Sequence, residues 1–236
     1  MRIVQPGEGS RDSEYIATLA ELDHALTHEF FGRVAVVSSF GVESAVLLAL
    51  VAEIDRSVPV LFLDTGRHFD ESLDYRHELA DHLRLTEIRD LRPDAAALAA
   101  VDPDRTLAVH DSDACCFVRK VVPLETALDG FDAWISGRKR RQSSTRAALP
   151  SRESVDGRIK LNPLAGWSAA ALAAEHRRRG LPVHPLVAFG YRSVGCMPCT
   201  RPVVDGEGDR DGRWAGSSKI ECGIHRPGTA AVALNP

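Results

Sequence analysis

Residues 34–63, VAVVSSFGVESAVLLALVAEIDRSVPVLFL, decide the fold of this chain. The stretch opens with an apolar run at 34–37 and closes with another at 58–63, and each has the length of a buried strand. Residues 42–54, which lie between them, are predicted to form a helix. Two buried strands joined by a helix are typical of neighbouring strands in a parallel sheet.

The same alternation continues on both sides of this unit. The spacing of Ile16, Leu19, Leu22 and Leu26 predicts a helix over residues 13–31. Further helices are expected at 69–83, 117–128 and 168–179, further strands at 86–88 and 133–136, and a hairpin at Asp156-Gly157. We therefore predict an α/β fold, with a mostly parallel sheet that carries helices on both faces.

Length and composition set limits on the class of protein. The chain has 236 residues, 44% of them hydrophobic, which allows one domain with a substantial core. Its net charge of −4 argues against a nucleic-acid-binding surface. No apolar run is long enough to cross a bilayer, and no apolar N-terminal signal segment is seen, so we expect a cytoplasmic protein without structural disulfides.

Four of the five cysteines form two tight pairs, Cys115-Cys116 and the C-x-x-C motif Cys196-Met197-Pro198-Cys199. Paired thiols of this kind indicate a metal or cluster site. Adjacent cysteines fit an iron–sulfur cluster better than one tetrahedral zinc, because each ligated corner of a four-iron cluster is a separate iron. A zinc site, buried free thiols and a redox dithiol remain open as alternatives.

The fifth cysteine, Cys222, stands alone in a polar segment near the C-terminus. Lys219 and His225 lie close to it in sequence, and Arg210 and Arg213 precede it. Cations near a thiol lower its pKa and favour the thiolate, so Cys222 is a candidate nucleophile. A stray thiol in a disordered tail is the plainer alternative.

Three loops follow predicted strands at the sheet edge where ligands bind in such folds. Ser38-Ser39-Phe40-Gly41 combines hydroxyls, a glycine and a helix N-terminus, which favours an anion or nucleotide, although it is not a P-loop. Leu63-Asp64-Thr65-Gly66-Arg67 adds a glycine and a cation. Residues 137–146, from Gly137 to Arg146, contain four consecutive basic residues that could clamp phosphate or sulfate. Plain turns or a solvated basic face are the alternative readings of these loops.

Together and in this order, these pieces resemble the iron–sulfur adenylyl-sulfate (APS) reductases of the sulfonucleotide reductase family. The resemblance runs from about Val34 to His225. Its most specific motifs are the two cysteine pairs, the second continuing as Thr200-Arg201-Pro202, and residues 219–225, KIECGIH. One departure lies in the basic loop, where Lys139 and Arg141 stand in place of the family's more usual arginine and acidic residue.

The resemblance implies an adenine-nucleotide alpha-hydrolase-like fold and reduction of APS to sulfite and AMP. The Cys222 thiolate would attack the sulfur of APS, and thioredoxin would then release sulfite from the S-sulfocysteine. A [4Fe-4S] cluster would be bound by Cys115, Cys116, Cys196 and Cys199. The implied substrate-binding residues are Ser38, Ser39, Phe40, Gly41, Leu63, Asp64, Thr65, Gly66, Arg67, Lys120, Gly137, Arg146, Arg210, Arg213 and His225.

The resemblance also implies a division of the chain and leaves other functions open. Residues 1–14 are expected to be flexible, residues 15–200 to form the nucleotide- and cluster-binding domain, and residues 201–236 to form a mobile tail with Cys222. Alternatives are a reductase of the 3′-phosphorylated substrate (PAPS) or of both nucleotides, an ATP pyrophosphatase-type adenylating enzyme, and a cluster-based sensor. Glu43 stands where adenylating enzymes usually have Asp. A homo-oligomer is left open.

Overall fold

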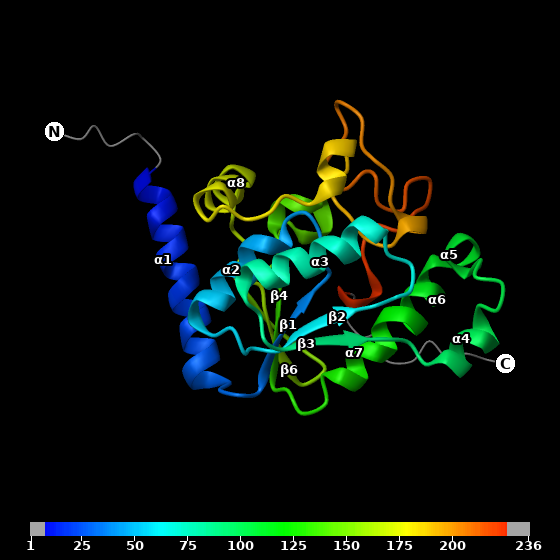
Figure 1. Ribbon diagram of the computed structural model, residues 1–236, viewed down its shortest axis with the longest axis horizontal. Coiled ribbons are helices and arrows are strands. Elements are labelled where there is room, and N and C mark those ends of the chain that lie inside the picture. The colour runs from blue at the N-terminus through cyan, green and yellow to red at the C-terminus, as the bar shows by residue number, and fades with distance from the viewer. Residues whose placement is uncertain (1–7, 226–236) are drawn as a thin grey trace.

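A six-stranded sheet forms the centre of the molecule (Figure 1). The computed structural model describes residues 8–225, with side chains from residue 13 onward. The strand order is β3-β2-β1-β4-β6-β5, and every neighbouring pair is parallel except the hairpin of β5 and β6. The strands are β1 (Val34–Ser38), β2 (Val60–Leu63), β3 (Ile88–Leu91), β4 (Ala133–Ser136), β5 (Arg152–Val155) and β6 (Arg158–Leu161).

Helices cover both faces of this sheet, as the sequence predicted. Because strand side chains alternate between faces, β1 sends Val34 and Val36 to one side and Ala35 and Val37 to the other. The first side packs against α1 (Glu8–His24), α2 (Ser44–Ile54), α3 (Asp70–Leu83) and α8 (Ala169–Arg178). The second packs against α7 (Val122–Ala127). Burial on both faces explains why the central strands read as continuous apolar runs.

Several element boundaries differ from expectation. The first helix begins at Glu8 instead of residue 13, and a π-helical turn, η1 (Ala25–Glu29), follows it. The strand expected at 86–88 begins at Ile88, because the backbone N–H of Thr86 is bonded to the carbonyl of Arg56 in the connection before it. The short helices α4 (Ala95–Val101) and α5 (Leu107–His110) were not predicted; neither buries a residue, so neither has an apolar face to detect.

Other predictions of local structure are confirmed. Asp156 and Gly157 turn the β5–β6 hairpin with φ values of 50° and 78°, the left-handed conformation that such a two-residue turn requires. The oxygen of Ser168 caps α8 by accepting the N–H of Ala171 at 3.0 Å. The helix expected at 117–128 begins earlier, with α6 (Ser112–Cys116), continues through the π-helical turn η2 (Phe117–Val121), and ends in α7 with Pro123 in its first turn.

The chain beyond α8 has little regular structure. It contains the short 3₁₀ turns η5 (Pro185–Phe189), η6 (Met197–Cys199) and η7 (Gly223–His225), and one antiparallel bridge between Thr200 and Arg213. In Figure 1 the red end of the described chain lies against α6 at the carboxyl edge of the sheet, and η7 contacts both α6 and η2. Within residues 8–225, no helix is both long and apolar enough to span a membrane.

The strand order fixes where a ligand site is expected. From β1 the chain moves to β2 and β3 on one side, and then returns to place β4 on the other side of β1. The loops after β1 and β4 therefore leave in opposite directions and open a crevice between them, at the point where ligands bind in open α/β sheets. Two further 3₁₀ turns, η3 (Arg140–Gln142) and η4 (Ser144–Arg146), follow β4 at this edge.

Candidate active site

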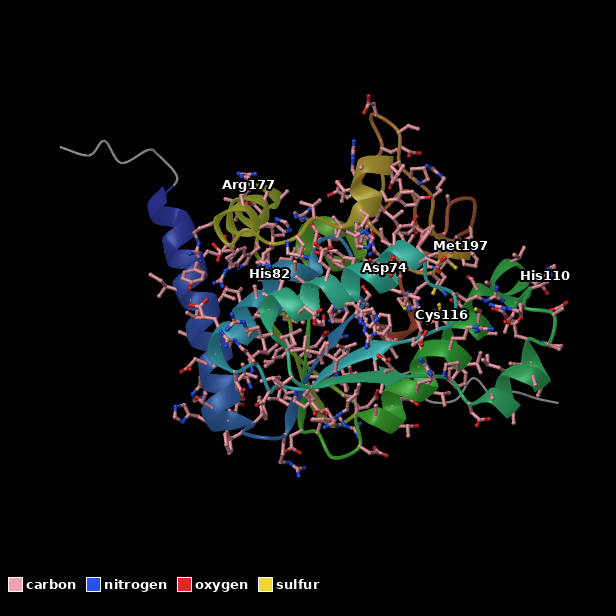
Figure 2. The ribbon with its side chains drawn as sticks, in the orientation of Figure 1. Asp74, His82, His110, Cys116, Arg177 and Met197 are labelled. Carbon is pink, nitrogen blue, oxygen red and sulfur yellow. The ribbon has the colours of Figure 1, made fainter. Side chains whose placement is uncertain are left out.

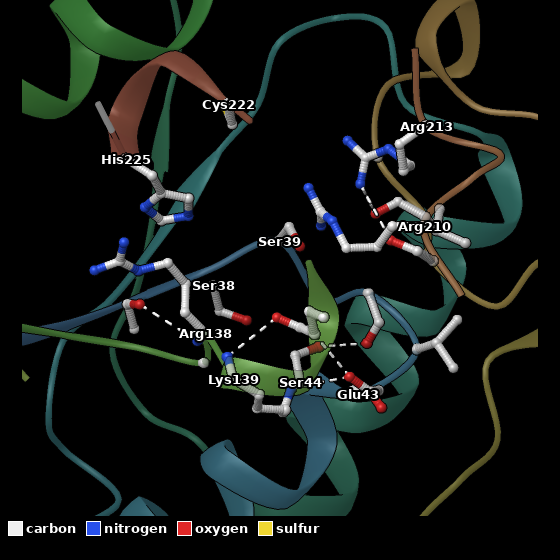
Figure 3. A pocket seen from close by; sticks show the side chains of 18 of the residues that line it. Ser38, Ser39, Glu43, Ser44, Arg138, Lys139, Arg210, Arg213, Cys222 and His225 are labelled. Atoms are coloured by element: carbon white, nitrogen blue, oxygen red, sulfur yellow. Dashed lines mark hydrogen bonds and ion pairs between the residues drawn. The ribbon is translucent and has the colours of Figure 1, made fainter. Parts of the chain in front are cut away.

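A cavity of about 190 Å³ lies at this crevice (Figure 3). Figure 3 shows Ser38 and Ser39 from the β1 loop, Arg138 and Lys139 from the β4 loop, and Cys222 and His225 from the C-terminal segment facing it. The structure therefore brings together residues more than 180 positions apart in sequence. The predicted site residues that line the cavity are Ser38, Ser39, Gly41, Leu63, Lys120, Gly137, Arg146, Arg210, Arg213, Cys222 and His225.

The β1 loop makes a tight turn into α2. The hydroxyl of Ser38 accepts the backbone N–H of Phe40 at 3.1 Å, and Phe40 adopts a left-handed conformation with φ 48°. The ring of Phe40 is fully buried against Phe62 in the core, so this predicted site residue shapes the loop and does not line the cavity. The loop presents serine hydroxyls and the start of α2 to the cavity.

Glu43, at the start of α2, faces the basic loop after β4. Its carboxylate accepts hydrogen bonds from Lys139 Nζ at 3.0 Å, from Gln142 Nε2 at 2.9 Å, and from Arg141. The two positions that depart from the family pattern, Lys139 and Arg141, thus share one partner. This network closes one end of the cavity and holds the β4 loop against the β1 loop.

Cations crowd the cavity and perturb one another. Burial and the neighbouring Arg146 lower the pKa of Arg138 to about 10 and that of Lys139 to about 7. Burial and the charges of Arg146 and Arg213 lower the pKa of Arg210 to about 10. The ion pair with Glu43 works against this effect at Lys139. Mutually repelling cations in a concave site are stabilised by an anion, so the cavity is suited to a negatively charged ligand.

His225 lines the cavity next to Cys222, and Lys160 and Trp134 pack against it. The Nζ of Lys160 lies 3.2 Å from Nδ1 of His225 and 4.3 Å from the ring centroid of Trp134, against which the His225 ring stacks. Burial, followed by Arg138 and Arg146, lowers the pKa of Lys160 to about 6. Burial and the charge of Lys160 hold the pKa of His225 well below its usual value, so the imidazole is neutral at pH 7.

Cys222 lies where these cations meet the paired cysteines. The thiol of Cys116 hydrogen-bonds to Cys222, and this contact lowers the pKa of Cys222. Burial opposes the shift, but Lys120, the backbone N–H of Ile224 and Arg213 lower the pKa further, and the net result lies well below the ordinary value. A thiolate at this position is an available nucleophile that faces an anion-binding cavity.

The four paired cysteines converge from two segments. Cys115 and Cys116 end α6, and η6 runs from Met197 to Cys199; both segments lie at the end of the molecule where Figure 2 labels Cys116 and Met197. Burial raises the pKa of the Cys115 thiol, and Cys196 and Cys199 lie close enough that their charge would raise it further. Within the described residues, no three Cys, His, Asp or Glu side chains are grouped to hold a single metal ion.

Polar and cationic groups surround these thiols. The hydroxyl of Thr65 lies 3.3 Å from Sγ of Cys196, and Nζ of Lys219 donates to Sγ of Cys116 at 3.1 Å. Burial alone would lower the pKa of Lys120, but the charges of Cys196, Cys222 and Cys116 raise it above its ordinary value. Against the effect of burial, Lys120 lowers the pKa of Cys196, whereas burial raises the pKa of Cys115 and Cys199.

The loop after β2 joins the two cysteine segments, and of its residues only His68, with Leu63 at the end of β2, lines the cavity. The guanidinium of Arg119, three residues after Cys116, donates to the carbonyl of Thr65 at 2.8 Å and to the buried carboxylate of Asp102 at 2.6 Å. The carbonyl of Arg67 accepts the N–H of Met197 at 2.8 Å, and its side chain pairs with Asp102. Asp64, Thr65 and Gly66 line a separate hollow.

Several cavity residues were not identified from the sequence as site residues. Glu43 and Glu221 line the cavity; both stand beside motifs, but neither was assigned a role. Lys160 and Trp134 have no motif around them, and the fold places them next to His225. Asn162 accepts hydrogen bonds from Ser136 at 2.9 Å and Arg138 at 3.3 Å, which orients the β4 loop. A buried lysine in a strand could have been noticed, because Lys is rarely buried without a reason.

The sequence of this chain is similar to those of known reductases. Residues 33–202 match the family model described as the phosphoadenosine phosphosulfate reductase domain. The chain is 51% identical over 214 residues to an adenosine 5′-phosphosulfate reductase of Mesorhizobium japonicum, covering 91% of this chain and 84% of the relative. It is 39% identical over 203 residues to the protein of that name from Mycolicibacterium smegmatis, covering 84% and 85%.

Solved structures agree on the fold. A phosphoadenylyl-sulfate (PAPS) reductase from Candida auris matches with a TM-score of 0.65 and 24% identity, over 83% of this chain and 98% of the other. An FMN adenylyltransferase from Candida glabrata matches with a TM-score of 0.62 and 16% identity, over 85% and 70%. At these identities the likeness concerns the fold alone, and it confirms the expected adenine-nucleotide alpha-hydrolase-like architecture.

Proposed function

The chain belongs to the phosphoadenosine phosphosulfate reductase family, within the branch of the adenosine 5′-phosphosulfate reductases, and on that premise we propose that it reduces APS to sulfite and AMP in sulfate assimilation. The observation that carries the proposal is the position of Cys222. Its thiol faces a cavity formed by the β1 and β4 loops and surrounded by Lys120, Arg146, Arg210 and Arg213. A thiol beside a shell of cations suits attack on an anionic phosphosulfate, because the cations favour the thiolate.

The first step is a displacement at sulfur. The Cys222 thiolate attacks the sulfur of the APS sulfate group, and a bond forms between Sγ and that sulfur. The bond from sulfur to the oxygen shared with the phosphate breaks, and AMP leaves with the electron pair. The product on the enzyme is S-sulfocysteine at position 222.

The cations of the cavity stabilise the charge that moves in this step. Negative charge builds up on the phosphate oxygen of the leaving AMP, so guanidinium and ammonium groups fixed around it favour the transition state. Arg210 is inside the cavity wall and Arg213 is held by the carbonyl of Val194 at 3.2 Å. The hydroxyls of Ser38 and Ser39 and the start of α2 are placed for the nucleotide phosphate.

The second step needs a reductant, and we propose thioredoxin. A thiolate of thioredoxin attacks Sγ of Cys222, sulfite leaves, and a mixed disulfide remains. The second thioredoxin thiol then attacks the mixed disulfide, which restores the Cys222 thiolate and leaves thioredoxin oxidised. Two electrons thus pass from the dithiol to the sulfonyl group. The need for reduced thioredoxin and free thiols places the reaction in the cytoplasm.

The cysteine cluster fits a [4Fe-4S] group. Cys115, Cys116, Cys196 and Cys199 supply four thiols from two segments, and adjacent cysteines suit a four-iron cluster because each ligated corner is a separate iron. Lys219 Nζ donates to Sγ of Cys116, and the hydroxyl of Thr65 lies 3.3 Å from Sγ of Cys196, so both groups could compensate the negative charge of a thiolate-bound cluster. A bound cluster would hold the two cysteine segments together and set the local charge beside Cys222.

APS is preferred over PAPS in this proposal because the relatives with the highest identity above are named for APS. The hydrogen bonds that Glu43 accepts from Lys139 and Gln142 support a reductase over an adenylating enzyme, because they neutralise the acidic group that an ATP-bound metal would need.

An assay of sulfite release tests the function. Purified protein with reduced thioredoxin should convert APS to sulfite and AMP without consuming ATP, and should convert PAPS more slowly. Consumption of ATP with release of pyrophosphate would support an adenylating enzyme. Binding of nucleotide without any product would support a sensor, and faster turnover of PAPS would reverse the substrate preference.

A further inference from the structure

The carboxylate of Glu221 occupies the cationic part of the cavity. Its oxygens accept hydrogen bonds from Nε and Nη2 of Arg146, at 2.6 and 2.7 Å. Nη2 of Arg210 lies 3.5 Å from Oε1 of the same carboxylate. These guanidinium edges are the groups with which arginine binds phosphate or sulfate in a two-point manner. Glu221 and an anionic ligand therefore cannot both bind the fork of Arg146.

The ion pair between Arg146 and Glu221 is buried. The side chains of Arg146 and Glu221 are 6% and 12% exposed. Burial would raise the pKa of Glu221, but Arg146 and Arg210 hold it below its ordinary value, so the group is a carboxylate at pH 7. An internal anion in this position has the charge and the geometry of a ligand group.

The available space leads to the same conclusion. The cavity of about 190 Å³ is smaller than the roughly 300–1,000 Å³ of typical small-molecule sites. Displacement of a lining group would widen the cavity for a nucleotide. Of the acidic lining groups Glu43, Asp209 and Glu221, it is Glu221 that pairs with Arg146 and Arg210, and it lies in a stretch of irregular backbone just before η7.

Glu221 also positions the nucleophile. Its Oε1 accepts the backbone N–H of Cys222 at 3.0 Å, so the contact that holds Arg146 also fixes the start of the Cys222 peptide. When Glu221 leaves Arg146, this anchor of the segment is lost. Arrival of an anion and release of the Cys222 segment are then coupled through one side chain.

We propose that Glu221 is an internal competitor for the anionic group of the substrate. In the free protein it occupies Arg146 and holds the Cys222 segment in place, and the incoming anion displaces it. An occupant of this kind lowers the apparent affinity by the fraction of molecules whose site is free. The identity of the ligand as a sulfonucleotide rests on the proposed function, whereas the competition itself rests on the ion pair.

The test compares two carboxylate-to-amide variants of the full chain, purified anaerobically with its metal content intact. Glu221→Gln keeps the shape and an acceptor oxygen but removes the charge. Glu207→Gln is the matched control, because Glu207 makes the same two-point pair with Arg201, at 2.8 and 2.7 Å, and does not line the cavity. Calorimetry measures the Kd of each protein for AMP and for inorganic sulfate.

Glu221→Gln should bind both anions about tenfold more tightly than the wild type, and Glu207→Gln should bind them as the wild type does. Glu221→Asp keeps the charge and should stay near the wild-type affinity. Hydrogen exchange of the peptide covering residues 217–225 should be fast in Glu221→Gln without ligand. In the wild type it should become fast only when AMP is added.

Each outcome decides something. If Glu221→Gln binds AMP and sulfate no more tightly than the wild type, the competition is absent and the inference is wrong. If Glu221→Asp tightens binding as much as Gln does, packing and not charge is responsible, which also refutes it. If AMP binds none of the proteins but sulfate binds Glu221→Gln more tightly, the proposed function fails and the inference stands.

Discussion

The ammonium group of Lys219 donates a hydrogen bond to Sγ of Cys116 at 3.1 Å, which ties the Cys222 segment to the helix that carries the first cysteine pair. The same group donates to the carbonyl of Ser112 at 2.7 Å. On the other side of Cys222, His225 lines the cavity, and its Nδ1 lies 3.2 Å from Nζ of Lys160. The segment that carries Cys222 is therefore held at two points: by Lys219 at the cysteine cluster, and by His225 beside the anion-binding cavity.

Loss of the first anchor should slow the reaction more than it weakens binding. Lys219→Met keeps the packing on Trp214 but removes the charge and both hydrogen bonds. Because a misplacement of about 1 Å costs up to about 100-fold in rate, we expect kcat to fall roughly 10- to 100-fold, while Kd for AMP stays close to the wild type. Arg201→Met, at an exposed residue of the same segment, should retain kcat. A wild-type kcat in Lys219→Met would show that this anchor has no role.

Replacement of a paired cysteine and replacement of Cys222 should have different effects on the iron content of the protein. Protein purified without oxygen should be brown and contain about four irons per chain. Cys199→Ser should lose the iron, whereas Cys222→Ser should retain it, because Cys222 belongs to neither pair. Iron analysis and visible absorbance measure both. One tightly bound zinc and a colourless protein would contradict the cluster assignment.

Gly195 should be required for the position of Arg213. A Cβ at position 195 would overlap the guanidinium group of Arg213, which crosses this glycine to reach the carbonyl of Val194. Arg213→Ala should weaken APS binding or turnover by about 2–5 kcal/mol, and Gly195→Ala should give a similar loss. The double variant should lose no more than Arg213→Ala alone, because both changes act on one contact.

Gly166→Ala is the matched control for this pair of variants. A Cβ at position 166 meets its nearest neighbours, Arg140 and Glu14, at 3.5 Å, which is ordinary contact. Losses that add in the double variant, or a fully active Gly195→Ala, would mean that Arg213 does not depend on this glycine.

Anion binding should take up protons. The pKa values of Lys139 and Lys160 are lowered to about 7 and about 6, so at pH 8 both are mostly neutral. A bound anion favours their charged forms and raises both pKa values, so affinity should increase as the pH falls from 8 to 6. Sulfate is the suitable probe because it does not titrate in this range. The charged and titratable groups that face Lys160 are Arg138, Arg146, Glu153, Glu221, Cys222 and His225.

Calorimetry in two buffers with different ionisation enthalpies measures the proton uptake. Lys160→Met should reduce the uptake and Glu207→Gln should leave it unchanged. Sulfate binding without net proton uptake at pH 7.5, or affinity that rises with pH, would contradict the lowered pKa values of the two lysines.

Much of the fold could be predicted from the sequence because the central strands are buried on both faces. The runs at 34–37 and 133–136 read directly as strands, and Asp156-Gly157 specified its hairpin. The edge strand β3 was misplaced because Ile88–Leu91 has two adjacent charged residues, Arg89 and Asp90, between its apolar ends and therefore carries a weaker signal. The helices α4 and α5 were missed because they bury no residue.

Site residues could be predicted from the sequence only where they belong to a local motif. Cys222, His225 and the serines of the β1 loop belong to such motifs and line the cavity. Glu43 and Glu221 stand beside such motifs, but their partners Lys139 and Arg146 come from a distant loop, which no spacing in the sequence indicates. Lys160 reaches His225 only through long-range packing. Arg67 was expected to bind substrate, but the structure pairs it with Asp102, and its role toward a ligand remains a prediction.

The most direct test of the central claim is the mass of the Cys222 peptide after incubation with APS in the absence of thioredoxin. The proposed mechanism predicts one added sulfonate, about 80 Da, on this peptide alone, because an SO₃ group is transferred to the thiolate. Reduced thioredoxin should remove the group and release sulfite, and Cys222→Ser should bind AMP but form no adduct. An adduct on Cys196 or Cys199, or turnover that survives in Cys222→Ser, would contradict it.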